Sequence, residues 1–178
     1  AISNHPGKAG QLFVSTTRIG CTMVHAKLGI GSDNSGKLVA EVKKRAKALA
    51  EQQCKDLVLV DGSPGIGCPV VSSISGASFV VLVTEPTVSG LHDLQRVFEL
   101  VKKFKIPSGC IINKSDINLD MTEKIIEYLD SQRIHILAVL PYDESVTRAM
   151  IEERTIVEYE QNNMIKDQLK KAWQRLGE

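Results

Sequence analysis

"DLVLVDGSPGIGCPV", residues 56–70, is the stretch from which the fold is predicted. Its first part is a short, continuously apolar run, which is typical of a strand that is covered on both faces in a parallel sheet. Asp61 ends that run, and the glycine-rich turn of residues 62–67 follows at once. In sheets of this kind, ligands bind at the carboxyl ends of the strands. We therefore expect a ligand site beside Asp61.

Three further apolar runs follow, and they alternate with segments of helical periodicity. The runs are "SFVVLVTEP" (78–86), "GCIINKSD" (109–116) and "IHILAVLPYD" (134–143). The helical segments between them cover residues 91–104 and 121–132. Strands that alternate with helices form right-handed crossovers in a parallel sheet. The predicted fold class is therefore α/β, with a mostly parallel sheet flanked by helices on both faces.

The two ends of the chain differ from this alternating region. Residues 11–29 resemble two amphipathic strands joined at 18–20, and we expect them at an edge of the sheet. A helix is expected over 35–53, with its inward side formed by Leu38, Val42, Arg45, Ala46 and Leu49. The terminal helix within 160–178 is expected to pack on the sheet. We expect one domain of 178 residues, in which residues 1–30 hold the edge strands.

Composition limits the kind of partner and the compartment. Charged residues make up 24% of the chain and the net charge is +1, so a nucleic-acid or membrane surface built on bulk charge is not expected. No apolar run approaches the roughly 18 residues of a membrane span, and the start does not resemble a signal peptide. The four cysteines form no C-x-x-C pair, which favours reduced thiols in the cytoplasm.

The turn after the first run offers the groups that a phosphate and a metal ion require. Asp61 can hold a magnesium ion directly or through water. The glycines let the backbone approach a ligand, and the amide of Gly65 can donate to a terminal phosphate oxygen. The alternative is a tight glycine–proline turn that only joins a strand to a helix.

Two later loops carry polar residues at the same edge of the predicted sheet. "NKSD" places Asn113 and Asp116 after a buried strand, in the pattern by which guanine-specific P-loop proteins bind the base. The alternative is a polar loop in which Asp116 or Asn118 begins a turn. In the next loop, Pro141 and Asp143 either line a base pocket or, for Asp143, cap a helix.

These motifs together resemble a known family. Residues 60–97, "VDGSPGIGCPVVSSISGASFVVLVTEPTVSGLHDLQRV", with "INKSD" (112–116) and "LPYDESV" (140–146), are similar to the MinD/ParA/Mrp group of deviant P-loop ATPases. The greatest similarity is to the branch with an inserted ferredoxin domain, and it extends from about Cys21 to Tyr159. The resemblance implies an ATPase that binds ATP and magnesium, often as a homodimer, and that acts as a nucleotide-dependent switch linked to iron–sulfur cluster or electron-transfer assembly.

The resemblance also implies a role for each site residue. Asp61 corresponds to the Walker B acid, which is catalytic and holds magnesium, mostly through water. Gly65 lies in the second switch near the γ-phosphate. Asn113 contacts the purine, and Pro141 and Asp143 lie on the base side. In this group the asparagine matters more than the aspartate of "NKSD", so the motif does not by itself indicate a GTPase.

The chain departs from the family in one respect. It contains neither the G-K-G-G-x-G-K-T type phosphate loop nor the cysteine-rich ferredoxin insert, in which an iron–sulfur cluster would be bound. We therefore expect either the C-terminal part of a longer ATPase or a domain whose phosphate loop comes from elsewhere, and we expect this chain alone to bind nucleotide weakly and to hydrolyse none. "GSDNSGKL" (31–38) imitates a phosphate loop, but Leu38 stands where a magnesium-binding hydroxyl is required. We expect Ser35 to cap a helix there, the alternative being an anion at the helix N-terminus.

Several other interpretations remain open. Cys68 is either a metal or cluster ligand shared between two copies, as the Mrp side of the family suggests, or a small buried thiol, which we favour. The chain is alternatively an interaction module with a degenerate nucleotide site, a GTPase if "NKSD" is taken at face value, or a core similar to the cobyrinic acid a,c-diamide synthases (CobQ/CbiA-like).

Overall fold

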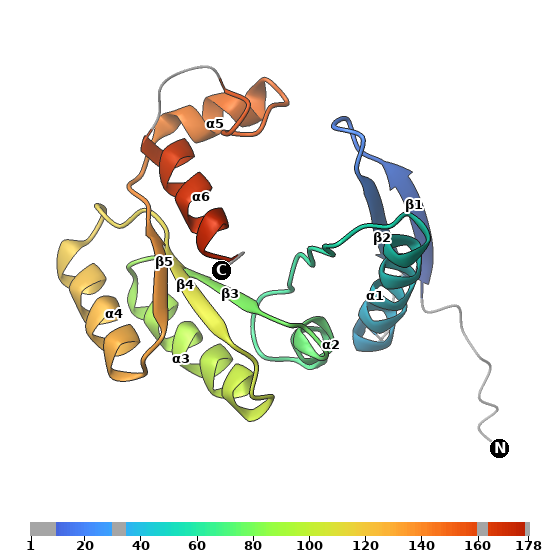
Figure 1. Ribbon diagram of the computed structural model, residues 1–178. Helices are drawn as coiled ribbons and strands as arrows, with labels where there is room; N and C mark the ends of the chain where they lie inside the picture. Colours follow the sequence, from blue (N-terminus) through green and yellow to red (C-terminus); the bar gives the residue numbers. More distant parts are fainter. Residues whose placement is uncertain (1–9, 30–34, 160–163, 177–178) are drawn as a thin grey trace. The chain divides into compact units, whose positions relative to one another are not determined.

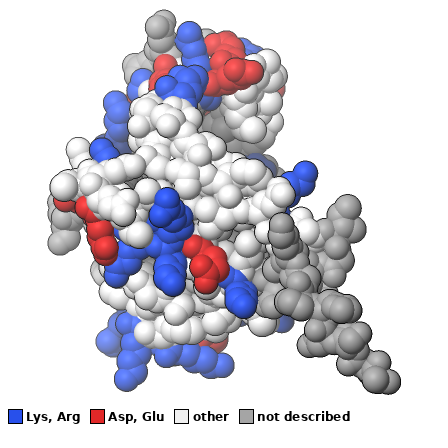
Figure 2. Space-filling model, turned by 90° about the vertical axis from the view of Figure 1, so that its right-hand side faces the viewer, with Lys and Arg blue, Asp and Glu red and all other residues white. Residues whose placement is uncertain are grey.

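The computed structural model describes residues 10–29, 35–159 and 164–176. It divides the chain into two compact units, Ala1–Ala77 and Ser78–Glu178 (Figure 1). In the described part of the chain, no helix has the length and apolar character that crossing a bilayer requires. The face in Figure 2 shows basic and acidic side chains next to one another, as the net charge of +1 predicts.

The first unit begins with an antiparallel hairpin. Strands β1 (Gly10–Thr16) and β2 (Thr22–Leu28) pair in regular register over all seven residues. Gly20 takes a φ of +81° in the connecting turn, a conformation that favours glycine. Two strands joined at residues 18–20 are therefore confirmed. In the described residues β1 and β2 form a two-stranded sheet of their own, and their place at the edge of the main sheet stays a prediction.

Helix α1 (Ser35–Gln52) packs against both the hairpin and helix α2 (Cys68–Ile74). The side chain of Leu38 lies against Gly10, where a Cβ atom would meet Leu38 Cδ2 at 2.9 Å. The predicted inward position of Arg45 is wrong, since this residue is exposed. Lys43, which the helical apolar pattern did not select, is instead half-buried.

Lys43 joins α1 to the end of α2 through hydrogen bonds. Its ammonium group donates to the carbonyl oxygens of Ser72 (2.9 Å), Ser73 (2.6 Å) and Ser75 (2.7 Å). The last carbonyl groups of a helix have no partner within that helix, so a cation satisfies and stabilises them. Lys43 is half-buried, and this burial lowers the pKa of its ammonium group below 10.5.

The run of residues 57–60 does not form the strand that the sequence predicts. These four residues have no regular secondary structure, and Leu59 is 81% exposed. A parallel strand needs a neighbour to satisfy its backbone groups. In the described part of the first unit β1 and β2 pair only with each other, and the run has no adjacent strand. All four residues are exposed in the first unit, so the burial that their apolar pattern predicts is not observed there.

The second unit contains the predicted parallel sheet, with strand order β3-β4-β5. The strands are β3 (Val80–Thr84), β4 (Ser108–Ile112) and β5 (His135–Val139). Helices α3 (Val88–Lys103) and α4 (Leu119–Ser131) are the two crossovers. The α/β class with a parallel sheet flanked by helices is thus confirmed.

Successive residues of β4 contribute to the two faces of this sheet. Cys110 and Ile112 are fully buried on one side, as are Val101 of α3 and Ile125 and Leu129 of α4. The alternate residue, Ile111, packs against a cluster formed by β5 and helix α6 (Met164–Arg175). In Figure 1, α3 and α4 lie on the face of the sheet opposite α6.

Strand β5 contains a β-bulge, and Arg175 of α6 binds to it. The pairing of β4 with β5 shifts by one residue between Cys110 and Ile111, so Leu137 is an extra residue in β5. Nη1 of Arg175 donates to the carbonyl oxygens of Ile136 (3.3 Å) and Leu137 (2.9 Å). Consecutive carbonyls of a regular strand point in opposite directions. The bulge therefore lets one guanidinium bind both.

Candidate functional site

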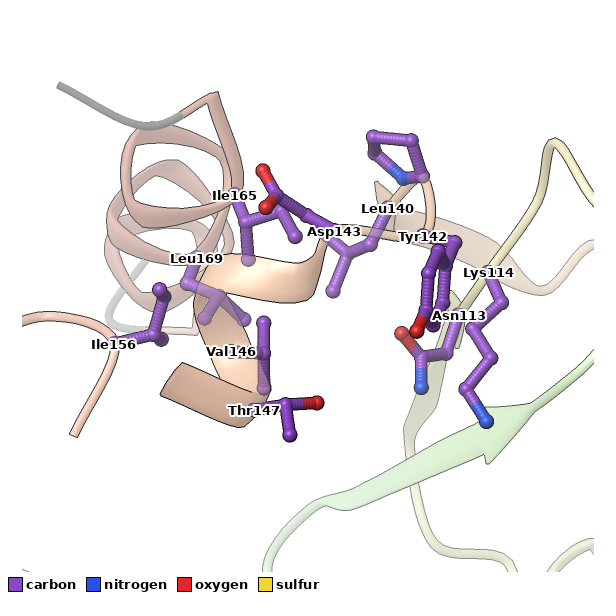
Figure 3. A pocket seen from close by; sticks show the side chains of 11 residues that line it. Asn113, Lys114, Leu140, Tyr142, Asp143, Val146, Thr147, Ile156, Ile165 and Leu169 are labelled. Atoms are coloured by element: carbon purple, nitrogen blue, oxygen red, sulfur yellow. The ribbon is translucent and has the colours of Figure 1, made fainter. Parts of the chain in front are cut away.

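A pocket lies in the second unit at the carboxyl ends of β4 and β5, where the sequence predicts a base site. Its volume is about 200 Å³. Apolar residues from the loop after β5, from helix α5 (Glu144–Ile151), from the loop after α5 and from α6 form its floor: Leu140, Pro141, Val146, Ile156, Ile165 and Leu169. Polar side chains form its rim: Asn113, Lys114, Tyr142, Asp143 and Thr147 (Figure 3).

The two loops that carry the rim are tied together by hydrogen bonds. The backbone N–H of Ser115 donates to the carbonyl of Leu140 at 2.8 Å. Oδ1 of Asp116 accepts the backbone N–H of Tyr142 at 2.7 Å. The buried hydroxyl of Thr122 donates to the carbonyl of Ser115 at 2.7 Å and attaches the first loop to α4. The rim is thus held by hydrogen bonds within the protein, from both backbone and side chains, and does not depend on a ligand for its shape.

Asn113 is held at the mouth of the pocket. Its backbone N–H donates to the carbonyl of Thr84 at the end of β3, at 2.8 Å. The side-chain nitrogen lies 3.5 Å from Oε1 of Glu85. The same carboxylate oxygen lies 2.8 Å from Nζ of Lys114. Asn113 is half-buried, which leaves part of its amide accessible to a ligand.

Pro141 and Asp143 line the same pocket as Asn113, so the structure brings these three predicted residues together. Oδ1 of Asp143 also accepts the backbone N–H of Ser145 at 2.7 Å and caps α5. Asp143 therefore caps a helix and also lines the pocket, while its contact with a base stays a prediction. An acceptor at this position of a helix typically contributes about 1 kcal/mol.

The other predicted site residues belong to the first unit. Asp61 is exposed at the start of the glycine-rich turn, so its carboxylate is not enclosed by hydrocarbon. Gly65 has a φ of +87°, which a residue with a side chain would rarely adopt. Asp61 and Gly65 are thus available to a ligand, and the two groups of predicted residues lie in separate units.

Cys68 is not the buried thiol that the sequence favoured. It begins α2 and is exposed, while the buried cysteine is Cys110 in β4. A Cβ atom on Gly36 would lie 3.1 Å from Cβ of Cys68, so the first turns of α1 and α2 touch. The described residues contain no group of three or more histidine, cysteine or acidic side chains that could hold a metal ion. Within a single chain they therefore do not fit an iron–sulfur cluster, which needs four such ligands.

The loop that imitates a phosphate loop is only partly described. Residues 31–34 lie outside the described residues, and Ser35 is the first residue of α1. Capping by Ser35 stays a prediction. Leu38 is half-buried and touches Gly10, so its side chain serves packing in the first unit.

The floor of the pocket is the part that sequence reasoning missed. The terminal helix was expected to pack on the sheet, and its residues Ile165 and Leu169 do pack with β5. They also close one side of the pocket, together with Ile156. Their helical spacing signals a buried face but not what that face covers. Lys114 and Tyr142, adjacent to predicted residues, are the rim residues that the motifs could have indicated.

Comparisons with known proteins identify similar folds and distant relatives. No protein-family model matches the chain. The structure is similar to the cell-division ATPase MinD of Pyrococcus furiosus, with 22% sequence identity and a TM-score of 0.63 over 82% of this chain and 59% of that one. MinD of Pyrococcus horikoshii OT3, solved as a complex with Mg-ADP, gives 21% identity and a TM-score of 0.63 over 82% and 57%.

Sequence relatives are consistent with this likeness. An uncharacterised protein of Methanocaldococcus jannaschii is 25% identical over 160 residues, which cover 90% of this chain and 52% of that protein. The chloroplastic homologue of the septum site-determining protein MinD from Arabidopsis thaliana is 30% identical over 98 residues, or 53% of this chain and 30% of that protein. The chain therefore spans about half the length of its first curated relative. Its fold is that of the MinD and ParA ATPases.

Proposed function

We propose that this chain is the nucleotide-binding portion of a MinD/ParA-type ATPase, in which both units belong to one nucleotide-binding domain. The observation that carries the proposal is the pocket at the carboxyl ends of β4 and β5, lined by Asn113, Pro141 and Asp143. In doubly wound sheets this edge is where ligands bind. The resemblance to the family placed the base at these same three residues.

The size and chemistry of the pocket suit a base. Its volume of about 200 Å³ is below the roughly 300 to 1,000 Å³ of pockets that enclose drug-sized ligands. An apolar floor can hold the flat faces of a purine, while Asn113 and the exposed Tyr142 stand at the rim. The ribose and phosphates would then extend beyond the pocket.

Asp61 and Gly65 are proposed to serve the phosphate end of the nucleotide. An exposed carboxylate is a suitable oxygen ligand for magnesium, directly or through water. Magnesium supplies charge stabilisation during phosphoryl transfer when it is bound. The left-handed conformation of Gly65 suits a backbone amide that turns toward an anion.

A role as a GTPase has less support. In guanine-specific sites the aspartate of "NKSD" binds the base, whereas Oδ1 of Asp116 accepts the N–H of Tyr142 at 2.7 Å.

Three further proposals rest on the resemblance alone: a nucleotide-dependent switch, a homodimer, and a link to iron–sulfur or electron-transfer assembly. We propose that the isolated chain hydrolyses no ATP.

The test is a titration of the 178-residue chain with ATP, followed by NMR. We expect weak binding, with a dissociation constant on the order of 1 mM, and shifts confined to amides around the pocket. Asn113→Ala should weaken binding roughly fivefold to tenfold, and Gln174→Ala, an exposed amide on α6, should not. Equal binding by Asn113→Ala would refute the pocket as the base site. Submicromolar binding or turnover would instead make "GSDNSGKL" a working phosphate loop.

A longer protein that contains this chain separates the ATPase from an interaction module. Asp61→Asn removes the metal-binding charge but keeps the size of the side chain. We expect loss of ATP hydrolysis in that longer protein. Retention of its biological activity together with loss of hydrolysis would favour the interaction module.

A further inference from the structure

Glu85 is positioned to decide how Asn113 faces the pocket. It follows β3 directly, and the N–H of Asn113 donates to the carbonyl of the preceding Thr84 at 2.8 Å. This backbone hydrogen bond places the side chains of Glu85 and Asn113 beside each other. Oε1 of Glu85 then lies 3.5 Å from the side-chain nitrogen of Asn113 and 2.8 Å from Nζ of Lys114.

The carboxylate favours one orientation of the Asn113 amide. An ionised carboxylate is a hydrogen-bond acceptor and cannot donate. The NH₂ group of Asn113 therefore turns toward Glu85, and a flipped amide would place two acceptor oxygens against each other. Figure 3 shows the amide oxygen on the side of Asn113 that faces Val146, with the nitrogen turned away from it. The group presented to the pocket is an acceptor.

Asp116, the acidic residue in the loop that carries Asn113, binds a different loop. Oδ1 of Asp116 accepts the N–H of Tyr142 at 2.7 Å. Lys114, whose side chain is 37% exposed, is paired with Glu85. An exposed ion pair of this kind adds little stability. Its effect is on geometry, because it keeps the carboxylate beside Asn113.

We propose that Glu85 is a specificity-determining residue, which makes the pocket select a purine that carries a 6-amino group over one that carries a 6-oxo group. This inference rests on the proposed nucleotide site. A 6-amino group donates to the oxygen of Asn113. A 6-oxo group meets that same oxygen as a second acceptor, and it is bound only if the amide flips away from Glu85. Glu85 itself acts through Asn113 and is a positioning residue.

The first test compares adenosine and inosine 5′-monophosphates, which differ at position 6 and the adjoining ring nitrogen, by NMR titration of the whole chain. We expect the wild type to prefer the adenosine compound roughly tenfold, as one matched hydrogen bond allows. Glu85→Ala should reduce this preference to about twofold or less. Glu85→Gln should retain most of it, because the glutamine carbonyl still accepts from Asn113. The control Glu99→Ala, an exposed acid on α3, should behave as the wild type.

A second measurement needs no ligand. In the wild type the side-chain NH₂ resonances of Asn113 report its contact with Glu85, and Glu85→Ala should shift them while Glu99→Ala should not. Unchanged resonances, or a tenfold preference that survives in Glu85→Ala, would overturn the role of Glu85. If neither nucleotide binds to the wild type but the resonances shift in Glu85→Ala, the orientation is upheld and the proposed nucleotide function fails.

Discussion

Replacing Gly90, in the first turn of α3, is predicted to destabilise the fold even when the new residue is alanine. Its N–H donates to Oγ1 of Thr87 at 2.9 Å, and its carbonyl accepts from Oγ1 of Thr84 at 3.0 Å. A Cβ atom on Gly90 would overlap the backbone carbonyl oxygen of Glu85. It would also lie 3.0 and 3.2 Å from the two threonine hydroxyl oxygens. The backbone passes so close that only a hydrogen fits.

Two opposing effects decide the outcome of Gly90→Ala. Alanine is favoured over glycine in a helix by about 1 kcal/mol. Relieving the overlap requires movement of the backbone at Glu85, and overpacking of this kind costs about 1 to 3 kcal/mol. Each threonine hydrogen bond that is lost costs about 1 kcal/mol more. We therefore expect a net destabilisation of about 2 kcal/mol, or a fall in melting temperature of roughly 4 to 8 °C for a chain of this size.

Thermal unfolding followed by circular dichroism measures this difference. His92→Ala is the matched control, because His92 lies in the same helical turn and is 64% exposed. It should gain the helix propensity of alanine without a clash and should stabilise by about 0.5 kcal/mol. If Gly90→Ala raised the melting temperature as much as the control does, the close approach of Glu85 would be refuted.

Two further predictions concern one side chain in each unit. Lys43→Met should lower the free energy of unfolding in urea by about 2 kcal/mol, because three carbonyls at the end of α2 lose a charged donor. The control Lys44→Met, at an exposed position of the same helix, should change the free energy of unfolding by less than about 0.5 kcal/mol. Burial raises the pKa of the Cys110 thiol from 9.0 to about 12. Cys110 should therefore resist a thiol reagent at pH 8 until the protein unfolds. Because the folded state holds this proton more tightly, stability should fall as pH rises above about 9, and Cys110→Ala should remove that fall.

The strands of the second unit could be predicted because each apolar run carries its own signal. The runs at 78–86 and 134–143 contain β3 and β5, the run at 109–116 contains all of β4 but its first residue, and the helices between them end near the expected residues. The run at 57–60 has the same pattern but forms no strand. Hydrophobic periodicity describes what a segment can bury, whereas a strand also needs a hydrogen-bonded neighbour.

The candidate site was predictable where it depends on loops after strands. Asn113, Pro141 and Asp143 come together because parallel strands end at one edge. The role of Lys43 was not predictable, because apolar spacing gives no weight to a lysine that donates to helix carbonyls. The part of the floor made by Ile165 and Leu169 depends on where α6 returns to the sheet, which local pattern does not reveal.

The extra residue in β5 affects the wall of the pocket that α6 forms, about thirty residues later in the chain. Deleting Leu137 would restore even pairing with β4, yet it would turn one of the two carbonyls away from Arg175. The last turn of α6 would lose its anchor, and the wall formed by Ile165 and Leu169 would loosen. A change that makes the strand more regular should therefore make the cavity less well formed.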